Sequence, residues 1–116
     1  MRRAAKIDAN QPDIVARFRE WKFSVAITSA VGQGFPDIVV GYRQLNVLVE
    51  IKDEAQPKRF RKLTPDQEKF HKQWLGPIVV VESLEDVDNL CTVIVKHQST
   101  VFPLDVSSFK RPSSTS

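Results

Sequence analysis

The chain has 116 residues, of which 41% are hydrophobic, which suffices for one small core and not for two. Its 17 basic and 14 acidic side chains leave a modest net charge of +3. The single cysteine, Cys91, excludes an intrachain disulfide and a cysteine metal cluster, and we expect it to be buried. No apolar run approaches the ~20 residues of a membrane span, and the basic start lacks the apolar run of a secretory signal. We therefore expect a soluble cytoplasmic protein with one domain, residues 1–106, and a polar tail, residues 107–116.

The first predicted element is an amphipathic helix over residues 10–21. Ile14, Phe18 and Trp21 recur there at helical spacing. Alternation of apolar and polar residues then predicts a strand over residues 23–28. The glycine-containing loop that follows it could bring the backbone close to a phosphate, or could be a plain flexible connection.

Two runs rich in Val, Ile and Leu, residues 35–42 and 45–53, follow the loop and have the pattern of a β-hairpin. Only Arg43-Gln44 separates them. If this pair forms a two-residue loop, Asp37 lies opposite Glu50. Directly opposed residues have Cβ atoms about 4.5–5.5 Å apart on one face of a sheet. The hairpin thus predicts two neighbouring carboxylates.

Lys52 follows Glu50 by two positions, so the period of a strand places both side chains on one face. Two carboxylates in contact raise each other's pKa unless a cation lies between them. Mg²⁺ prefers carboxylate, carbonyl and water oxygens, and the backbone carbonyl of Ile51 could supply one of them. A metal there could polarise a phosphoryl oxygen while the lysine stabilises negative charge, which favours phosphodiester hydrolysis. The alternative is an ordinary hairpin with an exposed charged face, but its strands are unusually apolar for that.

The second half of the chain begins with a helix. Thr64, Pro65 and Gln67 form a capping box with proline at the first helical position. The next elements are predicted from apolar runs and breakers. Phe70, Trp74 and Leu75 are expected to face inward from this helix, and Gly76-Pro77 to end it. A strand over residues 78–81, a short helix over 84–90 and a strand over 91–96 are expected to follow. His71 and His97 show no ligand spacing, and we read both as ordinary surface or packing residues.

The residues around the carboxylates resemble a known nuclease family. Pro36-Asp37 followed by Glu50-Ile51-Lys52 resembles the PD-(D/E)XK motif. Three blocks in order, DANQPDIV at 8–15, GQGFPDIVVG at 32–41 and LTPDQ at 63–67, resemble the virus-type replication-repair nuclease (VRR-NUC) domain in its stand-alone phage and prophage form. The resemblance spans about residues 3–90. The Glu-x-Lys triplet alone is a common pattern, whereas the three blocks together are specific.

The resemblance implies a PD-(D/E)XK fold, in which helices flank a mixed β-sheet in the order αβββαβ, with an extra C-terminal strand here available for edge pairing. It implies Asp37 and Glu50 as metal ligands, Lys52 as the catalytic lysine, and Mg²⁺ as the cofactor, with Mn²⁺ able to substitute. Its small stand-alone members are homodimers that cut four-way DNA junctions. DNA is therefore the expected substrate, and a homodimer the expected assembly.

Relatives usually add a glutamate from the first helix, and this chain has Gln11 at that place. A glutamine could still orient a water through its carbonyl, and Asp8 is a second candidate for the metal. Asp13 is the weakest candidate, since an acid in the first turn also offsets the helix dipole. Asn10 has the character of a helix cap.

Gln67 has two interpretations. It could bond back to the Thr64 backbone as part of the capping box, and the resemblance also implies a position near the active site, where it could touch the scissile phosphate. A basic run, Lys58, Arg59, Arg61 and Lys62, could contact DNA phosphates, or could be a solvated loop in which Phe60 anchors the chain to the core.

Together these features predict a Mg²⁺-dependent, structure-selective DNA endonuclease that resolves four-way junctions. One alternative is a flap or nicking nuclease that acts on other branched DNA. A different alternative is a DNA-binding module that keeps the fold without cutting, against which the presence of all three motif residues argues.

Overall fold

The computed structural model describes residues 7–99, 104–105 and 107–108. The predicted tail, 107–116, and the predicted domain boundary therefore lie largely outside the described residues. The elements in chain order are α1 (Gln11–Glu20), β1 (Ser24–Ile27), β2 (Ile38–Tyr42), β3 (Leu45–Ile51), the 3-10 helix η1 (Lys58–Phe60), α2 (Pro65–Gln73), β4 (Ile78–Val81) and α3 (Leu84–Gln98). None of the helices in this described part is long and apolar enough to cross a membrane. The predicted α/β class, a mixed sheet with flanking helices, is confirmed.

The four strands form one sheet in the order β1-β2-β3-β4. The pairs β1/β2 and β2/β3 are antiparallel, and β3/β4 is parallel. Alternate residues of β3, Val47, Val49 and Ile51, belong to the hydrophobic core formed with α1 and α3. We call this side of the sheet the packed face. By strand alternation, Leu48 and Glu50 point to the opposite side, which we call the site face.

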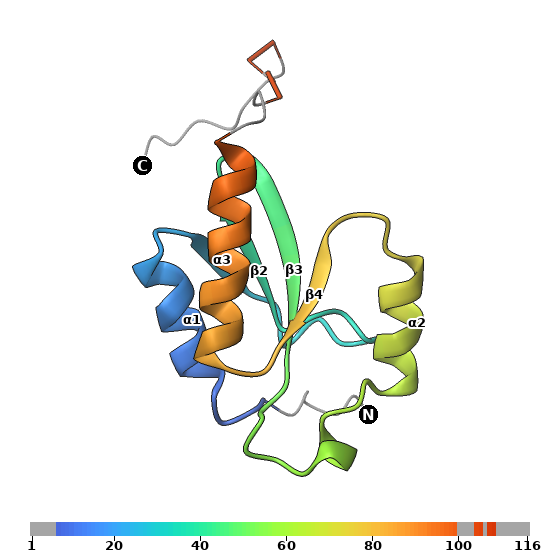
Figure 1. The fold of residues 1–116 in the computed structure, drawn as a ribbon. Helices are drawn as coiled ribbons and strands as arrows, with labels where there is room; N and C mark the ends of the chain where they lie inside the picture. Colours follow the sequence, from blue (N-terminus) through green and yellow to red (C-terminus); the bar gives the residue numbers. More distant parts are fainter. Residues whose placement is uncertain (1–6, 100–103, 106, 109–116) are drawn as a thin grey trace, which may run out of the picture.

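The helices divide between these two sides of the molecule. Figure 1 shows α1 and α3 side by side against the sheet, with α2 set apart from them beyond β4. In α1, the buried residues are Gln11, Ile14, Val15 and Phe18, so the predicted apolar stripe is confirmed. Trp21 is the C-cap of α1, where its backbone N–H donates to the carbonyl of Arg17, and its indole donates to Asp88 of α3 at 2.9 Å.

The predicted hairpin and its register are confirmed. Tyr42 pairs with Leu45 and Ile38 pairs with Val49, so one further step places Asp37 opposite Glu50. The loop residues Arg43 and Gln44 have φ angles of +44° and +71°. Positive φ at both central residues is the two-residue turn whose twist matches that of the paired strands, and here it forms without glycine. This short loop fixes the register of the two strands. A slip of one residue would turn every side chain of a strand to the other face of the sheet.

The predicted strand over residues 91–96 is wrong, because α3 continues unbroken through it. Its buried residues, Val87, Cys91 and Ile94, recur at steps of four and three, which is helical spacing. The run of β-branched residues after Cys91 favours a strand locally, but packing of this stripe against α1 and the sheet determines the helix. The last element of the described chain is thus a helix, and the sheet edge beside β3 is β4. Cys91 is buried as predicted, and burial raises the pKa of its thiol to about 12.

Helix α2 opens with the predicted capping box between Thr64 and Gln67. None of its residues is buried. Phe70 packs edge-on against Phe35, and Trp74 stacks on Phe70. The prediction that Trp74 and Leu75 face inward is wrong, since Trp74 is 41% exposed and Leu75 is fully exposed after the helix ends.

The start of α2 lies directly on the loop that precedes β2. Gly34 has a φ of +81°, and a Cβ there would clash with the backbone carbonyl of Asp66. The loop glycine therefore admits the helix, which is a role the sequence did not predict.

Candidate active site

Two carboxylates meet where β2 begins and β3 ends. Glu50 is 1% exposed, and Asp37 accepts a hydrogen bond from the Ile51 N–H at 2.7 Å. Burial, and then contact with the Asp37 carboxyl, raise the pKa of Glu50 to about 9, although the charge of Lys52 acts in the opposite direction. Without a cation, Glu50 therefore holds a proton at neutral pH. Asp37 and Glu50 are adjacent, as the hairpin predicts.

Lys52 joins the same cluster through Gln67. The Lys52 Nζ donates to Gln67 Oε1 at 2.8 Å, and Gln67 Nε2 donates to Glu50 Oε2 at 3.2 Å. The same Gln67 Oε1 accepts from the Thr64 N–H at 3.0 Å. Both predicted positions of Gln67, in the cap and beside the site, thus occur in a single conformation. Its contact with a phosphate stays a prediction.

His71 is the residue that the sequence interpretation missed. Its side chain is 14% exposed, and its Nε2 lies 4.0 Å from Glu50 Oε1. Burial, together with the charge of Lys52, lowers the pKa of His71. His71 follows Gln67 by four positions on α2, so both occupy one face of the helix. Once Gln67 was placed near the site, this spacing was the signal that could have found His71.

The first helix contributes less directly than predicted. Gln11 is buried, but its side chain donates to the Ser29 hydroxyl at 3.1 Å rather than meeting a carboxylate. Ser29 in turn donates to the backbone carbonyl of Asp37 at 3.4 Å. The charge of Asp8 contributes to the raised pKa of Glu50, so Asp8 lies within electrostatic reach of the site. Asp13 is exposed in the first turn of α1, away from these contacts.

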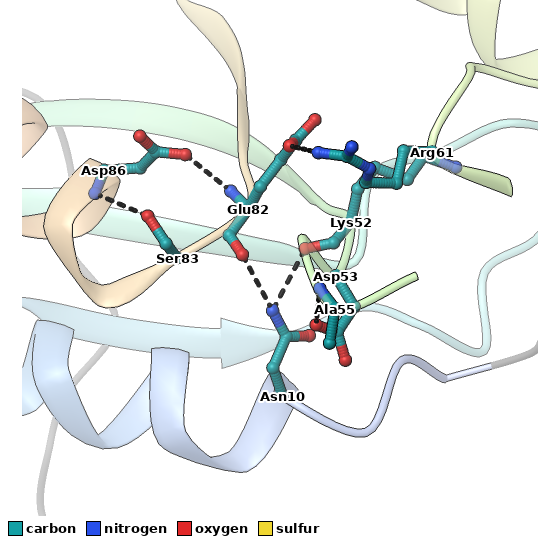
Figure 2. A network of polar contacts seen from close by, with 8 residues as sticks. All are labelled: Asn10, Lys52, Asp53, Ala55, Arg61, Glu82, Ser83 and Asp86. Carbon is teal, nitrogen blue, oxygen red and sulfur yellow. Dashed lines mark hydrogen bonds and ion pairs between the residues drawn. The ribbon is translucent and has the colours of Figure 1, made fainter. Parts of the chain in front are cut away.

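Asn10 precedes α1 at the predicted cap position, yet its side chain makes no cap bond. Figure 2 shows the contact it makes instead: its Nδ2 donates to the carbonyls of Lys52, at 3.0 Å, and Glu82, at 3.2 Å. These carbonyls lie where the parallel strands β3 and β4 end and their ladder stops. Asn10 therefore ties the two strand ends together at the backbone of the site lysine.

The basic run divides into exposed and paired residues. Arg61 donates to Glu82 at 2.8 Å, as Figure 2 shows, and its side chain is 22% exposed. Lys58, Arg59 and Lys62 are exposed. Phe60 is also exposed, with the guanidinium of Arg59 4.8 Å from its ring centre, so the predicted core anchor is wrong. Three of the four predicted DNA contacts are thus accessible, while Arg61 is engaged within the protein.

The carboxylate pair suits a hard divalent cation. Glu50 Oε1 is buried without a hydrogen-bond partner among the described residues, and it belongs to a carboxylate that faces a second one. Mg²⁺ characteristically uses one or two protein carboxylates, with other oxygens completing its shell. Among the described residues, no three His, Cys, Asp or Glu side chains form a metal-binding group. A role of the Ile51 carbonyl stays a prediction. Comparisons of the chain with protein-family models, curated proteins and solved structures gave no match.

Proposed function

We propose that this protein is a Mg²⁺-dependent endonuclease that hydrolyses phosphodiester bonds in DNA. The observation that carries the proposal is the convergence of Asp37, Glu50 and Lys52 in one polar cluster, with the two carboxylates in contact. A buried acid of strongly raised pKa beside a specific charged partner is typical of functional sites. The resemblance to VRR-NUC domains of the PD-(D/E)XK superfamily points to the same three residues.

Each residue has a defined task in this mechanism. Asp37 and Glu50 would hold Mg²⁺, or Mn²⁺ in its place. When bound, the ion supplies Lewis-acid polarisation of a phosphoryl oxygen and lowers the pKa of a water. Lys52 directs its ammonium group at the negative charge that develops on the phosphoryl oxygens. Gln67 sets the separation between Lys52 and Glu50, because its amide bonds to both.

The substrate we propose is branched DNA. Exposed Lys58, Arg59 and Lys62 follow β3 closely and can bind phosphates on either side of the cut, which gives affinity without sequence readout. The preference for a four-way junction, and a homodimer whose two-fold axis matches that of the junction, rest on the resemblance.

Digestion of a DNA panel tests the proposal. Four-way, flap, splayed and linear duplex DNAs are incubated with the protein in Mg²⁺, in Mn²⁺ or in EDTA, and the mass is measured by light scattering. We expect metal-dependent cutting, fastest on the four-way junction, by a dimer. Asp37→Asn should be inactive, and Asp13→Asn, the same change at an exposed acid outside the cluster, should cut normally.

Three outcomes would oppose parts of the proposal. Binding of DNA without cutting in either metal would favour the non-cleaving module. A monomeric mass with faster cutting of flaps would favour the flap nuclease. Equal activity of Asp37→Asn and wild type would contradict the site itself.

A further inference from the structure

Two buried polar atoms face each other without a hydrogen bond. Glu50 Oε1 and His71 Nε2 are both enclosed, and neither has a hydrogen-bond partner among the described residues. They lie 4.0 Å apart. A buried polar group without a partner costs free energy, so such groups are rare in folded proteins. An unpaired donor or acceptor on each side of one gap indicates that the two groups act on each other.

Helix α2 presents one polar face to the Glu50 carboxylate. Gln67 reaches Oε2 at 3.2 Å, and His71, one helical turn later, faces Oε1. The helix therefore addresses both oxygens of one carboxylate. Hydrogen bonds from neighbouring groups orient the carboxylates that hold metals, and loss of such a neighbour typically weakens metal binding.

We propose that His71 is a positioning residue of the site, whose Nε2–H donates to Glu50 Oε1 and, together with Gln67, fixes the direction in which the carboxylate meets Asp37 and a divalent cation. The inference rests on the proposed function. With a cation bound, Glu50 would be an ionised carboxylate, and the one N–H of a neutral His71 imidazole is then favoured on the nitrogen that faces it. The gap must shorten by about 1 Å to reach hydrogen-bond length. Since none of its residues is buried, α2 can make this small approach without repacking the core.

Metal binding by the protein alone tests this role. Binding of Mn²⁺ without DNA is measured by calorimetry for the wild type, His71→Leu, His71→Gln and His97→Leu. The leucine variant removes the donor at similar size, the glutamine variant can place an N–H near the position of Nε2, and His97→Leu makes the same change at the exposed histidine of α3. We expect His71→Leu to weaken Mn²⁺ binding about 10- to 100-fold, His71→Gln to recover most of it, and His97→Leu to bind as the wild type does.

Cleavage supplies a second readout. In His71→Leu, the metal concentration at half-maximal rate should rise, while the rate at saturating metal should fall much less. Circular dichroism checks folding; should the leucine variant not fold, His71→Asn and His71→Gln take its place, since asparagine places its amide differently. Wild-type Mn²⁺ affinity in His71→Leu, or equally weak Mn²⁺ binding in both amide variants, would overturn the role of His71 and leave the proposed function in place. A wild type that binds no Mn²⁺ and cuts no DNA would overturn the proposed function, and this inference with it.

Discussion

The two faces of the sheet are held in different ways. On the packed face, α1 and α3 bury Val49 and Ile51 completely within an apolar core. On the site face, α2 has no buried residue, and polar contacts with Glu50 and Lys52 join it to the sheet. Apolar burial contributes about 1.5–3 kcal/mol for each large side chain, whereas one hydrogen bond contributes about 0.5–1.5 kcal/mol net. The packed face therefore supplies most of the apolar burial that stabilises the fold, whereas fewer and weaker contacts hold α2 on the site face.

The largest expected effect is loss of a carboxylate. Asp37→Ala or Glu50→Ala should abolish cleavage, because the cation loses one of its two side-chain ligands. Thermal stability of the metal-free Glu50→Ala protein should hold or rise at neutral pH, since folding then no longer buries a carboxyl group that must take up a proton. Wild-type cleavage in either variant would show that the carboxylates on the site face take no part in the reaction.

Lys52 ranks next. Lys52→Ala should lower the single-turnover rate by on the order of 10²-fold, by analogy with the loss of one preorganised donor, with little loss of DNA affinity. Lys58→Ala, at an exposed lysine, should instead weaken DNA binding and reduce its salt dependence, with little change in the single-turnover rate. Weaker binding at an unchanged saturated rate in Lys52→Ala would make that lysine a phosphate clamp.

Gly34→Ala should separate the two faces. A Cβ at Gly34 would collide with the backbone of Asp66, so the start of α2 must move and carry Gln67 with it. Displacement of about 1 Å at such a site can cost up to ~10²-fold in rate. Gly32→Ala, in the same loop with a similar φ of +78°, controls for backbone strain and should cost less. Equal losses in both variants would show that strain, and not the position of α2, is responsible.

The parts of the molecule that follow local rules were predictable. The turn at Arg43-Gln44 fixes the hairpin register by itself, and from it follows the meeting of Asp37 and Glu50. Strand period alone then adds Lys52 to the same face. All of these positions lie close together in the sequence.

The parts that depend on docking could not be predicted from local rules alone. The helical continuation of α3 past Cys91 depends on its packing against α1, which outweighs the strand preference of its β-branched residues. His71 meets Glu50 only because of where α2 sits, a position set by the close approach at Gly34. The ion pair that engages Arg61 likewise requires knowledge of where Glu82 lies.

Stability should respond to pH through Glu50. Its pKa is about 9 in the folded protein and about 4.5 as the ordinary value, so between these values the folded state holds a proton that the unfolded state lacks. Stability is therefore greatest at the low end of this window and falls as pH rises, by at most about 1.4 kcal/mol for each pH unit. Urea denaturation in EDTA from pH 5 to 9 measures the slope. Glu50→Gln should flatten it, and an unchanged slope would assign it to other groups.

The smallest expected effect concerns Asn10, which belongs to neither face. Asn10→Ala removes the hydrogen bonds to the carbonyls of Lys52 and Glu82 and should lower the free energy of unfolding by about 1–3 kcal/mol. Asn10→Asp should cost more, because an acceptor would then face both carbonyls. Asn89→Ala, on the exposed side of α3, should stay within about 0.5 kcal/mol of wild type. A loss no larger in Asn10→Ala than in Asn89→Ala would show that the strand ends hold without this side chain.

The chain has two tryptophans, and each reports on a different side of the sheet. Trp21 packs against the core beside α3 and donates to Asp88, whereas Trp74 stacks on Phe70 at the end of α2 and is 41% exposed. Their fluorescence therefore provides two optical probes without any added label. In Trp74→Phe the remaining emission follows the core, and in Trp21→Phe it follows α2. Movement of the helix over the site can thus be recorded separately from unfolding of the domain.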